Sequence, residues 1–339
     1  MPIAAAALAA GVATAAATPV GLIDVHFHPM LPAIKQLTAA NPPANAADRA
    51  GLNFILDWGE SDALALMDAS KIDVAIQSLI PVQGMPADPA AAQAFVRDVN
   101  RQAAELMQRH AGRFGLFAAL SMTGPDQALR ELETAFDDYG ADGIGLLTNY
   151  QGVRLGEPVF DPVLAELNRR NAVLFVHPII GNIPTPRVYN LAIGHTEMPF
   201  EATRTIASLL FNGSFDKYPN IRFIFTHGGG AVPMLVDRWA QMARQFPSMS
   251  EQVPEGVNAT LARHHYDLAT VAHPTPFASL SKMAPMNHLL FGSDHPFLPI
   301  AAGARGLGDL GLSADQYKAI ARENALALFP RLAARSASA

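Results

Sequence analysis

The sequence contains no cysteine, and only 16% of its 339 residues are charged. The absence of cysteine excludes disulfide bonds, Cys-ligated zinc, iron–sulfur clusters and thiol nucleophiles. The formal net charge of −6 excludes the strongly basic surface typical of nucleic-acid-binding proteins, so we expect no nucleic-acid partner. The charged fraction lies well below the ~25% usual for soluble domains. It therefore indicates a large core or a buried subunit interface, and not a disordered chain.

Residues 1–19 differ from the rest of the chain, because they carry no charge and ten of them are alanine. The segment resembles the apolar core and cleavage region of a secretory signal, but it lacks the positive start of such a signal. It is too short for a membrane span, which needs about 20 strongly apolar residues. Three interpretations stay open: the tail of an export signal whose basic start lies upstream of Met1, a disordered extension, and an ordered helix used in assembly.

The rest of the chain alternates short apolar runs with longer helical patterns. The runs are apolar throughout, which is typical of parallel strands covered on both faces. Eight such units predict an α/β fold, a distorted (β/α)8 TIM barrel, as one domain over residues 20–339. The predicted strands are Leu22–Phe27, Ile72–Leu79, Phe114–Leu120, Gly143–Leu147, Val173–His177, Ile221–His227, His265–Ala269 and His288–Gly292. Pro29–Glu60 and Ile179–Met198 fit no unit, so we expect long loops after strands 1 and 5.

Residues that can bind a metal ion stand at the ends of four predicted strands. His26 and His28 close the first strand, and alternate side chains of a strand share a face. His177, His227 and Asp294 end three further strands or directly follow them. The C-terminal ends of barrel strands converge on one rim. Imidazole and carboxylate groups gathered there predict a metal site.

Four motifs in order carry a resemblance to a known family: IDVHFH, LFVHP, THGGGAVPMLVDRW and LFGSDHPF. Together they resemble the metal-dependent amidohydrolase superfamily, from about Gly21 to Phe329. HGGG with an arginine eleven residues after the histidine resembles most closely the branch of non-oxidative decarboxylases. That branch includes aminocarboxymuconate-semialdehyde decarboxylase and the salicylate- and resorcylate-type decarboxylases.

The resemblance implies a role for each residue of these motifs. His26, His28, His177 and Asp294 would bind one divalent metal ion. His227 would not be a main ligand; it would activate or orient metal-bound water, or handle a proton. For a hydroxybenzoate substrate Asp294 would be the proton donor, whereas in a semialdehyde-type mechanism metal-bound water activated by His227 would do that work. These two mechanisms stay open.

The resemblance also implies residues that contact the substrate. Arg238 matches a family arginine that reaches a neighbouring subunit's active site and holds the substrate carboxylate, which implies a homodimer or a dimer of dimers. A surface ion pair with Asp237 is the alternative. Phe297 falls where the family has an aromatic or apolar pocket residue. Arg49 is a poorly matching candidate for a second carboxylate-binding arginine.

The binuclear hydrolases of the superfamily carry a metal-bridging lysine at the end of strand 4. Gly143–Leu147 contains no lysine, so we expect a single ion. Three imidazole nitrogens and one carboxylate suit Zn2+ best, and Mn2+ also fits them.

We therefore expect a decarboxylase of a small aromatic or enoic carboxylic acid that resembles salicylate. A lactonase-type hydrolase of the same superfamily is the alternative, and a non-catalytic metal-binding barrel is a third. The family default for location is the cytoplasm.

Overall fold

The computed structural model of the chain describes residues 20–42, 53–81, 84–180, 191 and 193–332. The predicted leader, residues 1–19, lies outside the described residues, and so does Arg49. Within the described part of the chain, no helix is both long and apolar enough to cross a membrane.

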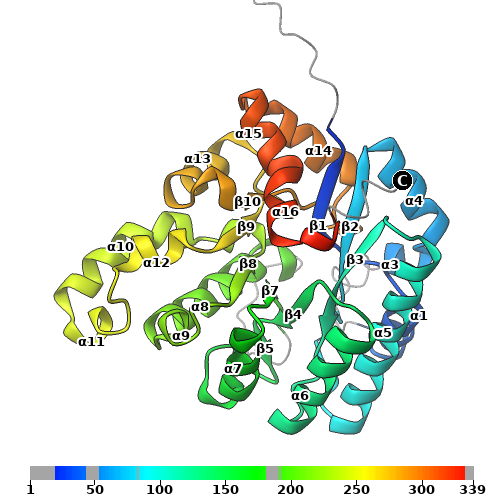
Figure 1. The fold of residues 1–339 in the computed structure, drawn as a ribbon, viewed down its shortest axis with the longest axis horizontal. Coiled ribbons are helices and arrows are strands. Elements are labelled where there is room, and N and C mark those ends of the chain that lie inside the picture. The colour runs from blue at the N-terminus through cyan, green and yellow to red at the C-terminus, as the bar shows by residue number, and fades with distance from the viewer. Residues whose placement is uncertain (1–19, 43–52, 82–83, 181–190, 192, 333–339) are drawn as a thin grey trace, which may run out of the picture.

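Eight parallel strands form one sheet in the order β1-β2-β3-β4-β7-β8-β9-β10, and helices surround it (Figure 1). This architecture confirms the predicted (β/α)8 barrel. The strands are β1 (Leu22–Phe27), β2 (Ile72–Ser78), β3 (Phe114–Ala119), β4 (Gly143–Leu147), β7 (Val173–His177), β8 (Arg222–Phe225), β9 (His265–Asp267) and β10 (Leu289–Leu290). A two-stranded hairpin, β5 (Asn149–Tyr150) and β6 (Val153–Arg154), follows β4.

The helices that cover the strands run along the whole described chain. They are α1 (Pro32–Ala40), α3 (Asn53–Asp57), α4 (Glu60–Ala69), α5 (Pro89–Arg109), α6 (Pro125–Glu133), α7 (Asp161–Arg169), α8 (Glu197–Phe211), α9 (Ser214–Lys217), α10 (Val232–Gln245), α11 (Pro247–Ser250), α12 (Val257–Ala262), α13 (Pro274–Met283), α14 (Ile300–Asp309), α15 (Ala314–Lys318) and α16 (Asn324–Leu328). Short 3₁₀ turns follow β7 at Ile193–His195 and β8 at His227–Gly229.

The alternation of side chains along β7 aims His177 into the barrel. Val173 and Phe175 belong to the inner core, whereas Leu174 and Val176 pack in the layer between strands and helices. His177 continues the face of Val173 and Phe175, because side chains two residues apart share a face. The last residue of the strand therefore points into the barrel at its C-terminal end.

Backbone hydrogen bonds between β1 and the segment after β10 close the barrel. The amide of Asp294 donates to the carbonyl of His26 at 2.8 Å, and the amide of His28 donates to the carbonyl of His295 at 2.7 Å. This closure places Asp294 beside both histidines of the first strand. The first and last motifs of the chain therefore meet at one place.

Three local features differ from the sequence-based expectation. The segment after β1 contains helices α1 and α3, and a proline opens α1 where its missing N–H costs no hydrogen bond. β8 ends at Phe225, so His227 lies in a turn and not in a strand. β10 covers only Leu289–Leu290, and Asp294 lies in the segment that closes the barrel.

Candidate metal centre

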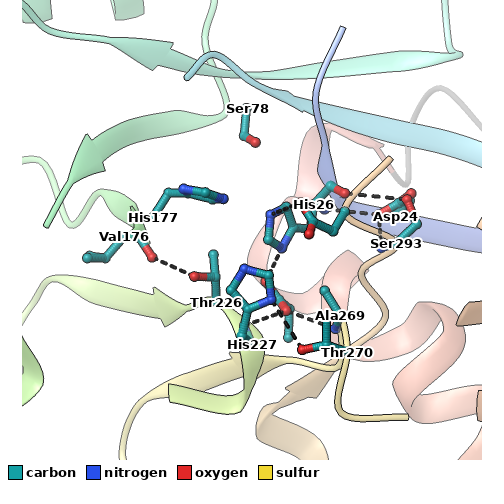
Figure 2. A network of polar contacts seen from close by, with 12 residues as sticks. Asp24, His26, Ser78, Val176, His177, Thr226, His227, Ala269, Thr270 and Ser293 are labelled. Carbon is teal, nitrogen blue, oxygen red and sulfur yellow. Dashed lines mark hydrogen bonds and ion pairs between the residues drawn. The ribbon is translucent and has the colours of Figure 1, made fainter. Parts of the chain in front are cut away.

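The structure brings together the five predicted metal-site residues at the C-terminal ends of the strands. The ligand atoms of His26, His177, His227 and Asp294 all lie within 4.8 Å of one another. Figure 2 shows His177, from the end of β7, and His227, from the turn after β8, approaching His26. His28 lies beside this group: its Nε2 is 3.0 Å from His26 Nε2 and 3.1 Å from Asp294 Oδ1. The grouping thus includes His227, which the resemblance did not make a main ligand.

Backbone carbonyls fix which ring nitrogen of two histidines carries the proton. His28 Nδ1 lies 2.9 Å from the carbonyl of Ser78, and His177 Nδ1 lies 2.8 Å from the carbonyl of Pro178. A carbonyl can only accept, so Nδ1 is the protonated nitrogen in both rings. Their Nε2 atoms keep a free lone pair. His177 Nε2 is buried and has no hydrogen-bond partner among the described residues, which is the state expected of a metal ligand.

The charges around His26 favour a cation at this place. Burial alone would lower the pKa of His26, but the carboxylates of Asp267 and Asp294 outweigh burial and raise it to about 10. Two carboxylates therefore face a fully buried imidazole. A divalent ion would supply the positive charge that this arrangement favours.

The remaining groups have the protonation states that metal coordination requires. Burial lowers the pKa of His177 well below its ordinary value, and burial also lowers the pKa of His227. For Asp294, burial would raise the pKa, but the neighbouring His26 outweighs it and holds the pKa well below its ordinary range. Neutral imidazoles and an ionised carboxylate form a donor set that fits a divalent metal ion.

Left-handed backbone conformations aim two of these side chains. His227 has φ +54° and Asp294 has φ +60°, values that residues other than glycine rarely adopt. The glycines after His227 allow a close approach to α8, because a Cβ on Gly230 would lie 2.1 Å from the carbonyl oxygen of Pro199. The HGGG motif thus has a steric cause that is independent of substrate.

Sequence reasoning missed Asp267, which contacts two of the site residues. This aspartate ends β9 and is fully buried. Its Oδ2 lies 2.8 Å from His26 Nδ1, and its Oδ1 accepts a hydrogen bond from the amide of His227 at 3.0 Å. One signal was available: an acidic residue stands between Tyr266 and Leu268 in a predicted buried strand, and a buried charge needs partners.

The two predicted substrate contacts lie in different places. The ring of Phe297 stands edge to face against His28, with 5.5 Å between centroids, so it borders the cluster. Arg238 is exposed on α10. Within the described residues Asp237 pairs with Asn258 at 3.2 Å, and no ion pair joins it to Arg238. The role of Arg238 at a neighbouring subunit stays a prediction.

The end of β4 carries no charged group. The chain continues from Leu147 to Thr148, whose Oγ1 accepts a hydrogen bond from the amide of Ile179 at 3.0 Å. Asn149 Nδ2 donates to the carbonyl of Ile179 at 2.6 Å. These contacts tie the segment after His177 to β4, at the place where binuclear relatives would carry their lysine.

Comparisons with known proteins agree with this site and fold. Residues 23–331 match the model of the amidohydrolase family. Decarboxylase yanB of Aspergillus niger is 31% identical, over 91% of this chain and 87% of its own length. The 6-methylsalicylic acid decarboxylase acuB of Aspergillus aculeatus is also 31% identical, over 91% of this chain and 96% of its own length. A crystal structure named Amidohydrorolase II superposes with a TM-score of 0.83 at 27% identity and covers 91% of this chain and 99% of its own.

The family match spans residues 23–331, the part of the chain that contains all four motifs. These comparisons confirm the resemblance seen in the sequence. The chain therefore belongs to the amidohydrolase family, in the branch that contains its decarboxylases.

Proposed function

We propose that this protein is a metal-dependent, non-oxidative decarboxylase of a small aromatic carboxylic acid with a hydroxyl group ortho to the carboxyl. The buried histidine and aspartate cluster carries the proposal, above all the unpartnered Nε2 of His177. The relative from Aspergillus aculeatus is named for 6-methylsalicylic acid, which belongs to this substrate class. The relatives named above are decarboxylases, and they give no support to the lactonase alternative.

One divalent ion would be held by His26, His28, His177 and Asp294. When bound, such an ion supplies a Lewis acid that can hold a carboxylate and a neighbouring phenolic oxygen. Zn2+ suits these donors best, and Mn2+ is the alternative. Because β4 ends in Leu147 and Thr148 follows it, with no lysine there, we expect one ion per chain. Metal analysis of the purified protein tests this number, and two ions per chain would contradict it.

The proposed reaction moves one proton and breaks one bond. A proton is added to the ring carbon that bears the carboxylate. The bond to the carboxyl carbon then breaks, its electron pair returns to the ring, and CO2 leaves. The candidate donors are His227, which as a neutral imidazole carries one proton, and Asp294, which as an ionised carboxylate must first take one up from solvent. Asp294 Oδ1 lies 3.1 Å from His28 Nε2 within the proposed ligand set, whereas His227 Nδ1 has a distant contact of 3.4 Å to Thr270 Oγ1.

We further propose a homodimer in which Arg238 of one subunit holds the substrate carboxylate in the other. Exposed apolar side chains on α10 and α8 support this interface: Met234 on α10 is 77% exposed and Phe200 on α8 is 45% exposed. The start of α10 lies against α8, because the amide of Ala231 donates to Thr203 Oγ1 at 2.8 Å. Exposed apolar residues on neighbouring helices are typical of subunit interfaces.

A substrate panel tests the proposed reaction. The metal-loaded protein is incubated with hydroxybenzoates and with lactones, while CO2 and acid release are followed separately. We expect CO2 from one or more ortho-hydroxybenzoates and no acid from the lactones. Acid release from a lactone, with no CO2 from any acid, would overturn the proposal.

A further inference from the structure

Asp267 uses both carboxylate oxygens on two different parts of the metal centre. Oδ2 faces His26 Nδ1 at 2.8 Å. Oδ1 accepts hydrogen bonds from the amides of His227 and Ala269, both at 3.0 Å. The carboxylate is fully buried, so water does not compete for any of these contacts.

We propose that Asp267 is a positioning residue that sets the tautomer of His26 and holds the backbone of His227. This inference rests on the metal site of the proposed function, but not on the decarboxylation itself. Asp267 lies outside the predicted ligand set, and it acts through the two histidines.

The contact with His26 decides which nitrogen can bind a metal ion. A carboxylate only accepts hydrogen bonds, so in the neutral ring that can bind a metal ion the proton of His26 lies on Nδ1. Nε2 then carries the lone pair, and it faces His28 Nε2 at 3.0 Å and Asp294 Oδ1 at 3.3 Å. Outer carboxylates of this kind raise the basicity of a ligand imidazole and fix its orientation.

The contact with His227 holds a conformation that costs energy. His227 has φ +54°, and Thr270, whose hydroxyl lies 3.4 Å from His227 Nδ1, has φ +61°. Such conformations persist where the surroundings fix them. Asp267 Oδ1 receives the amide of His227 and also the amide of Ala269 in the chain that leads to Thr270. One carboxylate thus holds both the backbone of His227 and the segment that leads to Thr270. Figure 2 shows His227 with Ala269 and Thr270 beside it.

A purely structural role is the alternative. An aspartate that accepts the amide two residues later forms an ordinary Asx turn, and the Ala269 contact has this form. An Asx turn explains the hydrogen bond that Oδ1 accepts from Ala269, but it does not explain why Oδ2 faces the imidazole of His26. The positioning role and the structural role predict different effects when the carboxylate of Asp267 is replaced by an amide.

Asp267→Asn is the decisive variant, because it keeps the shape of the side chain. The amide oxygen must take the Oδ1 position, since two backbone N–H groups need an acceptor there. The NH2 group then faces His26 Nδ1, and His26 must move its proton to Nε2. We expect metal affinity to fall about 10- to 100-fold, as measured by competition of Zn2+ with a chelator. A structural role would leave metal affinity unchanged.

Asp24→Asn is the matched control. Asp24 is also fully buried, and its Oδ1 accepts the amides of His26 and Ser293, both at 3.0 Å. The variant removes one buried charge beside His26 without placing an NH2 group against its ring. We expect it to keep its metal affinity. An equal loss of affinity in both variants would overturn the proposal, because charge alone would then explain the effect.

A measurement on the unaltered protein covers the case in which Asp267→Asn does not fold. Nitrogen-15 NMR of the Zn2+-loaded protein distinguishes protonated from metal-bound ring nitrogens. We expect a proton on Nδ1 and metal on Nε2 of His26. The reverse assignment would overturn the proposal. Neither readout needs a substrate, so failure of the decarboxylase assay would leave the result on Asp267 intact.

Discussion

His177 Nδ1 donates a hydrogen bond to the carbonyl of its neighbour Pro178 at 2.8 Å, which leaves the buried Nε2 aimed at the cluster. The chain thus fixes this imidazole as a neutral donor through the residue that directly follows it. Asp294 supplies the matching negative charge from the opposite end of the sequence.

His177→Ala removes this donor, so we expect the protein to lose its bound metal and its decarboxylase activity while it stays folded. Metal analysis after dialysis and a CO2 assay measure the two losses. His273→Ala is the control, because His273 is exposed at the start of α13. A His177→Ala protein that keeps one ion per chain would contradict the ligand assignment.

A pair of variants distinguishes the role of His28 from that of His227. His28→Ala should lose metal, because His28 is a proposed ligand. His227→Ala should keep metal but lose CO2 release by about 100-fold or more, as expected for a proton-handling group. Metal content and turnover of each purified variant are compared. If His227→Ala also loses its metal, His227 is a ligand, as its place in the 4.8 Å group allows.

The sequence predicts those site residues whose positions follow from the regular geometry of a strand. His26 and His28 share a face by alternation, and His177 follows from the inner-core positions of Val173 and Phe175. Asp267 was missed, because a charge in a predicted buried strand indicates a need for a partner but does not identify it as His26, 241 residues away in sequence. The helices α1 and α3 were missed, since the segment that contains them has no clear apolar period. The choice between His28 and His227 depends on distances that no pattern encodes.

Arg238→Ala tests the proposed contact across the subunit interface. We expect an unchanged metal content and a rise in KM on the order of 10- to 100-fold, which corresponds to the loss of a charge-assisted hydrogen bond. Arg244→Ala on the same helix is the control, because Arg244 is also exposed on α10. Steady-state kinetics on both variants measure the effect. Unchanged kinetics in Arg238→Ala would show that Arg238 does not bind the substrate.

Because His264 is buried, we expect the folded protein to lose stability in mild acid. Burial lowers the pKa of His264 from 6.5 to about 3, and its ring packs against Phe215, Phe223 and Phe225. Between these pH values the unfolded chain binds a proton that the folded protein excludes. Stability is therefore complete above pH 6.5 and falls towards pH 3, by up to about 1.4 kcal/mol per pH unit.

Urea unfolding at several pH values measures this effect. His264→Leu should unfold with a weaker pH dependence than the unaltered protein, whereas His273→Ala should not change the dependence. An equal acid dependence in His264→Leu would show that other groups cause it.

The proposed enzyme releases CO2 from an ortho-hydroxylated aromatic acid at its metal centre. The most direct measurement uses salicylate and 6-methylsalicylate labelled with carbon-13 in the carboxyl group, with the meta-hydroxy isomer as control. We expect metal-loaded protein to release labelled CO2 from an ortho-hydroxy acid, and the His177→Ala protein not to do so. Release at the same rate from the His177→Ala protein, or no release from either ortho-hydroxy acid, would contradict this expectation.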